Sequence, residues 1–227
     1  MATKKLTSII VPAYVQTELS AHITMACIAN IIKYTDPEEY ELILIHDIPK
    51  FAVRDDFKIF SQVNYREIIL DTYTNYSTKM NMAAKEAKGD YLAFVQNDCF
   101  VWGNWLTDLR WYLENGKGDC IIPHQWPTTY KFRKDAEEAT YEATLNGGAR
   151  DACMVMITKE AFAKAGGFND EIKAFVEADF YERMGRTGVS QITTSKALVT
   201  HLSLATYFQD PKQFNDNMHS DSLIRNK

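Results

Sequence analysis

Short apolar runs alternate with amphipathic stretches along the first hundred residues. Strands are expected where β-branched and other apolar residues cluster between breaker residues, and helices where apolar residues recur every three or four positions. The pattern predicts strands at 7–12, 40–45, 65–70 and 91–95, and helices at 18–34, 56–61 and 76–88. Strands that alternate with helices indicate an α/β fold with a mainly parallel sheet flanked by helices.

The second half of the chain has a less regular pattern. Apolar runs and helical spacing predict strands at 119–123, 152–157 and 197–200, and helices at 106–113, 159–165 and 177–186. Between them, residues 125–146 are polar and mixed. Because no repeat, low-complexity tract or linker interrupts the sequence, residues 1–227 are expected to form a single domain.

The composition is that of a globular protein with a packed core. Hydrophobic residues make up 46% and charged residues 24% of the 227 positions, which is close to average. The apolar runs are far shorter than the ~20 residues of a membrane-spanning helix, and the one near the N-terminus is too short for a signal peptide. The net charge of −5 argues against a protein whose binding depends mainly on nucleic-acid phosphates.

The four cysteines lie far apart, each inside an apolar segment. They form no CxxC pair and no Cys/His metal spacing. Disulfides are rare in reducing compartments, so this usage indicates reduced core thiols. Together with the expected lack of a membrane span, it favours a cytoplasmic protein. The cysteines are Cys27, Cys99, Cys120 and Cys153.

Polar residues directly follow two of the predicted strands. The stretch 91–105, YLAFVQNDCFVWGNW, places Gln96, Asn97 and Asp98 between two apolar runs, and Asp47 lies just beyond another predicted strand. Buried polar side chains cost free energy unless they are satisfied. Ligands of parallel α/β sheets bind at the carboxyl ends of strands. These four residues are therefore expected to face one crevice.

Six short segments carry a set of motifs in a fixed order. They are SIIVPAY at 8–14, Asn81 in a helix, GDYLAFVQND at 89–98, DACMVMI at 151–157, GGFND at 166–170 and EADFYER at 177–183. In this order they resemble the opening strand, the helix asparagine, one form of the DXD motif, the GACMLI strand, the GGFDE turn and the ED helix of family 2 glycosyltransferases. The resemblance runs from residue 8 to about residue 201 and covers most of the chain.

The resemblance implies the GT-A fold, a Rossmann-like, mainly parallel sheet with an acceptor-side C-terminal half. About residues 1–100 would bind the nucleotide and about residues 101–227 the acceptor. Such enzymes move a sugar from a nucleoside diphosphate, here expected to be a UDP- or dTDP-sugar, to a hydroxyl group. The transfer usually inverts the configuration at the anomeric carbon.

The DXD-like segment implies a divalent cation. A leaving diphosphate develops charge that a hard cation with oxygen ligands, Mn²⁺ or Mg²⁺, can offset. Asp98 is the expected ligand, although an aspartate here can also cap the turn into Trp102. Gln96 stands where the family has its first acid and Cys99 replaces a frequent second acid, so nucleotide phosphates are expected to complete the metal shell. Gln96 and Asn97 would orient the ribose or a metal-bound water.

Two histidines are candidates for the same site. His201 follows a short apolar strand, where many relatives carry a histidine that approaches the metal. The resemblance makes it a metal or phosphate ligand, and the alternative is a structural histidine with satisfied ring nitrogens. His219 has a weaker case, as part of a lid over the donor.

The general base must accept the proton of the acceptor hydroxyl as the bond to the anomeric carbon forms. Glu177 and Asp179 both lie in the ED-like helix, and because the segment is one residue short, the motif fits either acid. Residues two apart on a helix point to different faces, so at most one of them faces the crevice well. Asp179 has Arg183 four residues later as a natural ion-pair partner, which makes Glu177 the preferred base.

The donor-binding residues implied by the resemblance lie at strand ends and on one helix. Asp47 would accept a hydrogen bond from the edge of uracil or thymine, and the alternative is a turn aspartate before Pro49. Lys79, on the helix that faces the crevice, would either neutralise a phosphate or be solvated. The full set is Pro12, Ala13, Tyr14, Asp47, Lys79, Asn81, Gln96 and Asn97.

The acceptor cannot be identified from the sequence. Aromatic and basic residues between 124 and 150 would form its side of the crevice, where aromatic rings stack on sugars or bases, or else pack in the core. A glycan, a protein and a modified nucleic acid all remain open as acceptors. The residues concerned are Trp126, Tyr130, Arg133 and Arg150.

Two other functions are compatible with the same fold. A sugar nucleotidyltransferase normally has a glycine-rich phosphate loop after the first strand, and residues 13–17 contain no glycine. A non-catalytic module that binds a nucleotide sugar or a glycan would tolerate the missing first acid of the DXD motif.

Overall fold

The computed structural model describes residues 5–48, 56–126, 142–144, 153–173 and 176–202, and everything below concerns these residues. Their strands form one nine-stranded sheet in the order β3-β2-β1-β4-β8-β6-β9-β5, with β7 paired to β9. The strands are β1 (Thr7–Ala13), β2 (Tyr40–Asp47), β3 (Tyr65–Leu70), β4 (Tyr91–Val95), β5 (Cys99–Val101), β6 (Cys120–Trp126), β7 (Glu142–Thr144), β8 (Met154–Thr158) and β9 (Gln191–His201).

The sheet is mainly parallel, as the alternating pattern predicts. Strands β1 to β4 run side by side in one direction, and β6 and β9 are parallel to each other. Strand β8 lies between β4 and β6 and is antiparallel to both, so β6 and β9 point the same way as β1. Strands β5 and β7 are antiparallel to β9. The carboxyl ends of β1, β2, β4 and β9 therefore meet at the same edge of the sheet.

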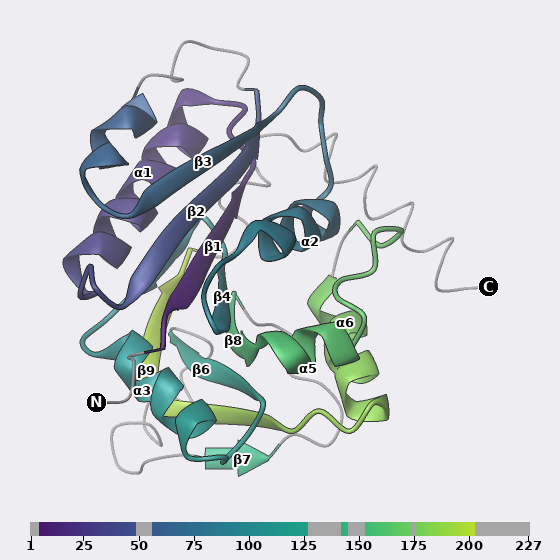
Figure 1. Cartoon of the computed structure of the whole chain (residues 1–227). Helices are drawn as coiled ribbons and strands as arrows, with labels where there is room; N and C mark the ends of the chain where they lie inside the picture. The colour runs from purple at the N-terminus through teal and green to yellow at the C-terminus, as the bar shows by residue number, and fades with distance from the viewer. Residues whose placement is uncertain (1–4, 49–55, 127–141, 145–152, 174–175, 203–227) are drawn as a thin grey trace.

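Helices cover both faces of this sheet, because successive side chains of a buried strand point to opposite faces. Ile9 and Val11 of β1 belong to a core with α1, η1 and α3, whereas Ile10 belongs to a second core with α2, α5 and α6. Figure 1 shows α1 on one side of the strands and α2, α5 and α6 on the other. The helices are α1 (Glu18–Lys33), η1 (Asp56–Gln62), α2 (Tyr76–Glu86), α3 (Trp105–Glu114), α5 (Lys159–Lys164) and α6 (Val176–Arg186).

The predicted helix start near residue 18 is fixed by a capping box. Thr17 is the N-cap, and its Oγ1 accepts a hydrogen bond from the backbone nitrogen of Ser20 at 3.1 Å. The Oγ of Ser20 in turn accepts from the backbone nitrogen of Thr17 at 3.0 Å. Thr17 and Ser20 thus satisfy backbone donors that the start of α1 would otherwise leave unpaired.

The predicted elements are present, with three differences. The helix expected at 56–61 is a 3-10 helix, and the strand expected at 197–200 is the eleven-residue β9. The short strands β5 and β7 were not predicted. Within the described residues, no helix is long and apolar enough to cross a membrane. The division of residues 1–227 into a donor half and an acceptor half stays a prediction.

Candidate active site

Asp98 and His201 come together at the edge where the parallel strands end. Asp98 follows β4 and His201 ends β9, and the backbone nitrogen of Leu202 donates to the Asp98 carbonyl at 3.0 Å. The Nε2 of His201 lies 3.1 Å from Oδ1 of Asp98, and Nδ1 lies 2.9 Å from Nε2 of Gln125. With the ring proton on Nδ1, the Nε2 of His201 has a lone pair that can join Asp98 in holding a cation.

This pair fits a divalent cation that is bound together with a nucleotide. It offers one carboxylate and one imidazole, and among the described residues no group of three His, Cys, Asp or Glu side chains could hold a metal by itself. A cation such as Mg²⁺ is often held by one or two protein ligands while substrate phosphates and waters fill the other positions.

Cys99, which stands where the family often has a second acid, has a fully buried thiol, 3.3 Å from the sulfur of Cys153.

The two amides before Asp98 have different partners. The Nε2 of Gln96 donates to Oε1 of Glu177 at 2.9 Å. The Nδ2 of Asn97 donates to Oγ1 of Thr24 in α1 at 2.8 Å, and Asn97 is buried. Gln96 therefore joins the end of β4 to α6, whereas Asn97 joins it to α1. Their expected contact with the donor stays a prediction.

Glu177 and Asp179 have separate environments, as their helical spacing predicts. Oδ2 of Asp179 lies 2.8 Å from both Nε and Nη2 of Arg183, so the predicted ion pair is present. Arg183 also donates from Nη1 to the Gly167 carbonyl at 2.7 Å. Glu177 instead faces Gln96 at the end of β4. Of the two acids, Glu177 is the one whose side chain contacts a residue at the end of β4. Which of them is the general base stays a prediction.

Asp47 and Lys79 form a buried ion pair beside the end of β1. The Nζ of Lys79 lies 2.7 Å from Oδ2 of Asp47 and 2.9 Å from the Ala13 carbonyl. The other Asp47 oxygen accepts from the backbone nitrogen of Thr74 at 3.0 Å. Burial lowers the pKa of Lys79, and the negative charge of Asp47 opposes that shift. The alternative of a solvated lysine is therefore wrong, because the residue is only 3% exposed.

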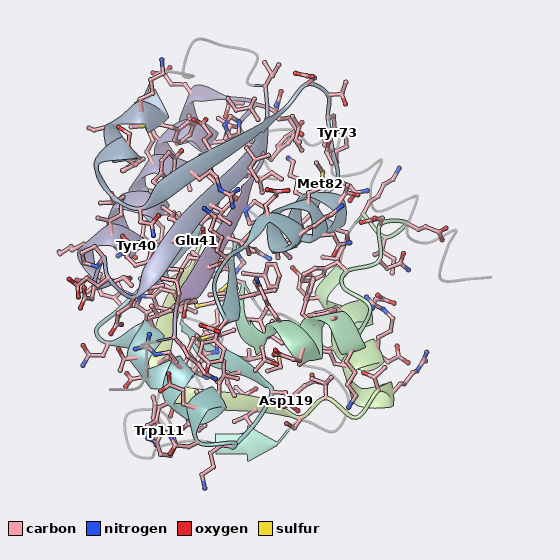
Figure 2. The ribbon with its side chains drawn as sticks, in the orientation of Figure 1. Tyr40, Glu41, Tyr73, Met82, Trp111 and Asp119 are labelled. Atoms are coloured by element: carbon pink, nitrogen blue, oxygen red, sulfur yellow. The ribbon has the colours of Figure 1, made fainter. Side chains whose placement is uncertain are left out.

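Two tyrosines are sequence neighbours of residues that contact this pair, because Tyr14 follows Ala13 and Tyr73 precedes Thr74. The ring of Tyr14 meets the ring of Tyr73 edge to face, with centroids 5.9 Å apart. Figure 2 shows Tyr73 on the segment that leads from β3 to α2. Pro12 and Ala13, which precede Tyr14, are buried at the end of β1. The end of β1 and the segment after β3 thus both approach Asp47.

Comparison with known proteins identifies the chain. The model of the family described as "Glycosyl transferase family 2" matches residues 8–169, which is most of the sequence. The chain belongs to the family 2 glycosyltransferases. The predicted family and its GT-A fold are confirmed, and solved glycosyltransferase structures share the same curled sheet flanked by helices.

One curated relative of this glycosyltransferase is the poly(ribitol-phosphate) beta-glucosyltransferase of Bacillus spizizenii. The two are 28% identical over 109 residues, which are 46% of this chain and 16% of the relative. The chain thus matches only a small part of that protein.

Two solved structures are similar to it in fold. TarS 1-349 of S. aureus, in complex with UDP-GlcNAc, has a TM-score of 0.67 at 16% identity, over 86% of this chain and 58% of that one. The mannosyltransferase PcManGT of Pyrobaculum calidifontis, in complex with GDP-Man and Mn²⁺, has a TM-score of 0.71 at 12% identity, over 92% of this chain and 60% of that one. The chain spans less than two thirds of either solved chain.

Asn81 connects α2 to the turn that precedes α6 in this glycosyltransferase. Its Nδ2 donates to the Phe168 carbonyl at 2.8 Å and to Oδ1 of Asp170 at 2.9 Å, and its Oδ1 accepts from the Phe168 nitrogen at 2.9 Å. A donor-binding role for Asn81 stays a prediction. Its observed contacts fix the GGFND turn.

Sequence reasoning missed three partners of the predicted site residues, and several predicted residues cannot be placed. The missed partners are Tyr73, Thr74 and Gln125. Tyr73 and Thr74 could have been noticed, because they closely follow a predicted strand at the same sheet edge. Outside the described part of the structure lie the side chain of Trp126 and residues Tyr130, Arg133, Arg150 and His219.

Proposed function

We propose that this glycosyltransferase moves a sugar from a UDP- or dTDP-sugar to an acceptor hydroxyl, with inversion and with Mn²⁺ or Mg²⁺. The observation that carries the proposal is that the Asp98–His201 pair and the Gln96–Glu177 pair both include a residue just after the end of β4. One pair suits a cation with a nucleotide diphosphate, and the other supplies a carboxylate for proton transfer. The structures of TarS with UDP-GlcNAc and of PcManGT with GDP-Man and Mn²⁺ support a nucleotide-sugar donor and a divalent cation.

The donor base lies at the ends of β1 and β2 in this proposal. Asp47, held by Lys79 and Thr74, accepts the N3–H of uracil or thymine with a remaining lone pair. Tyr14 and Tyr73 supply aromatic surface for the base, and Pro12 and Ala13 form the adjoining wall. A guanine also carries a ring N–H, so GDP-sugars are included in the test below.

Asp98 and His201 are the residues that would hold the cation. When bound, the cation offsets the negative charge that develops on the leaving diphosphate. Because the protein supplies two ligands, we expect weak Mn²⁺ binding by the free protein and much tighter binding when UDP is present.

Glu177 accepts the proton in the transfer step. The acceptor oxygen forms its bond to the anomeric carbon while the bond from that carbon to the diphosphate oxygen breaks on the opposite side. The electron pair leaves with the diphosphate, and the hydroxyl proton moves to the Glu177 carboxylate. Attack opposite to the leaving group inverts the anomeric configuration. Asp179 is the weaker candidate because its carboxylate is paired with Arg183.

The test measures hydrolysis of UDP-, dTDP- and GDP-sugars with and without Mn²⁺. We expect turnover that needs the cation and is lost in Asp98→Ala. We expect Glu177→Gln to bind UDP normally but to turn over at least ~10²-fold more slowly, the usual contribution of a general base. Asp179→Asn, an equivalent change on the same helix, is the matched control for the base.

Other outcomes would support the alternative functions. Binding of nucleotide sugars without turnover, unchanged by Glu177→Gln, would replace the enzyme with a non-catalytic binding module. Consumption of a sugar phosphate and a nucleoside triphosphate would indicate a sugar nucleotidyltransferase. Acceptors are then screened among glycans, proteins and modified nucleic acids with the donor that is turned over.

A further inference from the structure

Gln96 replaces an acid of the DXD motif, and its side chain contacts another acid. Its Nε2 donates to Oε1 of Glu177 at 2.9 Å, across 81 residues of sequence. Both side chains are half-buried. This contact differs from the role expected from the motif, in which the residue would serve the ribose or a metal-bound water.

The backbone of Gln96 is held firmly on the sheet side of this contact. Its nitrogen donates to the Cys153 carbonyl at 2.9 Å, and its carbonyl accepts from the Cys99 nitrogen at 3.0 Å. The Cys27 thiol also donates to the same carbonyl at 3.6 Å. Strand β4 itself lies between β1 and β8 inside the sheet. These bonds fix the backbone from which the Gln96 side chain extends toward Glu177.

Helix α6 is anchored on the other side. Phe180 is fully buried, with its ring centroid 4.3 Å from that of Phe168, and Tyr181 is fully buried one turn after Glu177. The helix backbone is thus fixed, but a glutamate side chain still has three rotatable bonds. A hydrogen bond to its carboxylate restricts them.

The chemistry of the pair depends on the amide. An amide N–H is a donor and an ionised carboxylate accepts only, so glutamine at position 96 complements Glu177. A carboxylate at position 96 would face Glu177 with like charge, which favours protonation of one of the two. A general base must be unprotonated before it can accept a proton.

We propose that Gln96 is a positioning residue that holds the Glu177 carboxylate, ionised, beside the end of β4. This inference rests on the proposed role of Glu177 as the base. If the contact only joined α6 to the sheet, its loss would not change the pH dependence of turnover.

The first test is independent of activity. In the chain of residues 1–227, the side-chain ¹⁵N–¹H signal of Gln96 is followed by NMR as the pH is lowered, with assignment from Gln96→Asn. We expect the signal to move as Glu177 takes up a proton and to stay still over the same range in Glu177→Gln. Tyr181, whose charge would interact with Glu177, has a pKa raised well above its usual range by burial and stays neutral. A signal that titrates identically in both proteins, or in neither, would overturn the proposal.

The second test uses the pH dependence of donor turnover. Gln96→Glu is expected to lower kcat roughly 10- to 100-fold with little change in the KM of the donor, as for a misplaced catalytic group. The acid limb of its pH–rate profile should move to higher pH. In a Glu177→Gln background, the same substitution should cause little further loss, because coupled residues are not additive.

Asn30→Asp is the charge-matched control. It also converts a half-buried amide to a carboxylate, but it lies in α1, and its Oδ1 accepts from the Val101 nitrogen in β5 at 2.7 Å. We expect the position of its acid limb to stay that of the wild type.

The two proposals fail in different ways. If Glu177→Gln loses turnover but Gln96→Glu keeps the wild-type kcat and pH profile, the positioning role of Gln96 is overturned and the proposed function stands. If Glu177→Gln keeps wild-type turnover, the role of Glu177 as base fails, and the positioning inference fails with it.

Discussion

At the scale of single residues, Lys79 carries a charged side chain that is almost completely buried. Its side chain is 4% exposed and that of Asp47 is 3% exposed, and their charged atoms are 2.7 Å apart. A buried charge is tolerated when a partner and further hydrogen bonds satisfy it. Here the Ala13 carbonyl and the Thr74 nitrogen complete the set. The ion pair therefore fixes the orientation of the Asp47 carboxylate, which we propose accepts a hydrogen bond from the nucleobase of the sugar donor.

Lys79→Met should destabilise the protein. It leaves the Asp47 carboxylate buried without its cation, which costs about 3–5 kcal/mol of unfolding free energy. Urea unfolding followed by circular dichroism measures the change. The double variant Lys79→Met/Asp47→Asn should recover part of the loss, because the unpaired charge is gone and the amide oxygen can still accept from Thr74. A single variant as stable as the wild type would show that solvent reaches Asp47.

At the scale of helices and strands, the strands in the first half of the chain were predicted more closely than those in the second half. Strands β3 and β4 have the predicted bounds, because breaker residues flank their apolar runs. Strands β5 and β7 have three residues each, too few to show a period. The direction of β8 was hidden because its residues MVMI are buried, and an apolar run reads the same in a parallel and an antiparallel strand.

Some contacts of the candidate site could also be predicted from the sequence, and others could not. The ion pair of Asp179 with Arg183 follows from helical spacing alone, so the sequence could predict it. The contact between Gln96 and Glu177 joins a strand end to a helix 81 residues later, and no local pattern encodes it. The burial of Lys79 was undecided for the same reason, since Lys79 is in α2 and its partner Asp47 ends β2, 32 residues earlier.

The turn before α6 depends on a glycine with a left-handed backbone. Gly167 has a φ of +68°, and a Cβ there would lie 2.7 Å from Oδ1 of Asn81. Gly103 has a similar φ of +58°, but nothing lies within 4 Å of its Cβ position. Alanine substitutions at these two glycines therefore compare backbone strain alone, at Gly103, with backbone strain plus steric overlap, at Gly167.

Gly167→Ala should cost more stability than Gly103→Ala. Both pay the strain of a left-handed alanine, about 1 kcal/mol, but only the first displaces Asn81. Thermal unfolding of both variants measures the difference. We also expect Gly167→Ala to slow donor turnover, because the turn leads into the helix that carries Glu177. Equal melting temperatures for the two variants would contradict the close contact with Asn81.

At the scale of the whole molecule, several weakly acidic side chains are wholly or partly buried, which favours their neutral form. Burial raises the pKa of the thiols above their ordinary 9.0 and that of the tyrosine hydroxyls above 10.0. In the unfolded chain these groups ionise at their ordinary pKa, so above about pH 9 the native state binds more protons. Stability is therefore lost as the pH rises. The groups are Cys27, Cys99, Cys120, Tyr40, Tyr65 and Tyr181.

The unfolding free energy should be unaffected by these groups at pH 7–8 and should fall steeply between pH 9 and 10.5. Each thiol contributes up to about 1.4 kcal/mol per pH unit. Lys79, whose pKa burial lowers, acts in the opposite direction but is one group against several. Urea unfolding under reducing conditions measures the slope, and Cys120→Ala should make it shallower by about one thiol. A flat profile up to pH 10 would show that the native thiols ionise normally.

The position of strand β9 near the end of the described chain determines when the pair of Asp98 and His201 can form during synthesis. It pairs with β5, β6 and β7 and ends at His201, whereas Asp98 is made about a hundred residues earlier. Because a chain is synthesised from its N-terminus, a nascent chain that has reached residue 190 already contains β1 to β4 and α6. It still lacks both the histidine and the strand that carries it. The pair of residues that we propose for the cation, Asp98 and His201, can therefore form only late in synthesis.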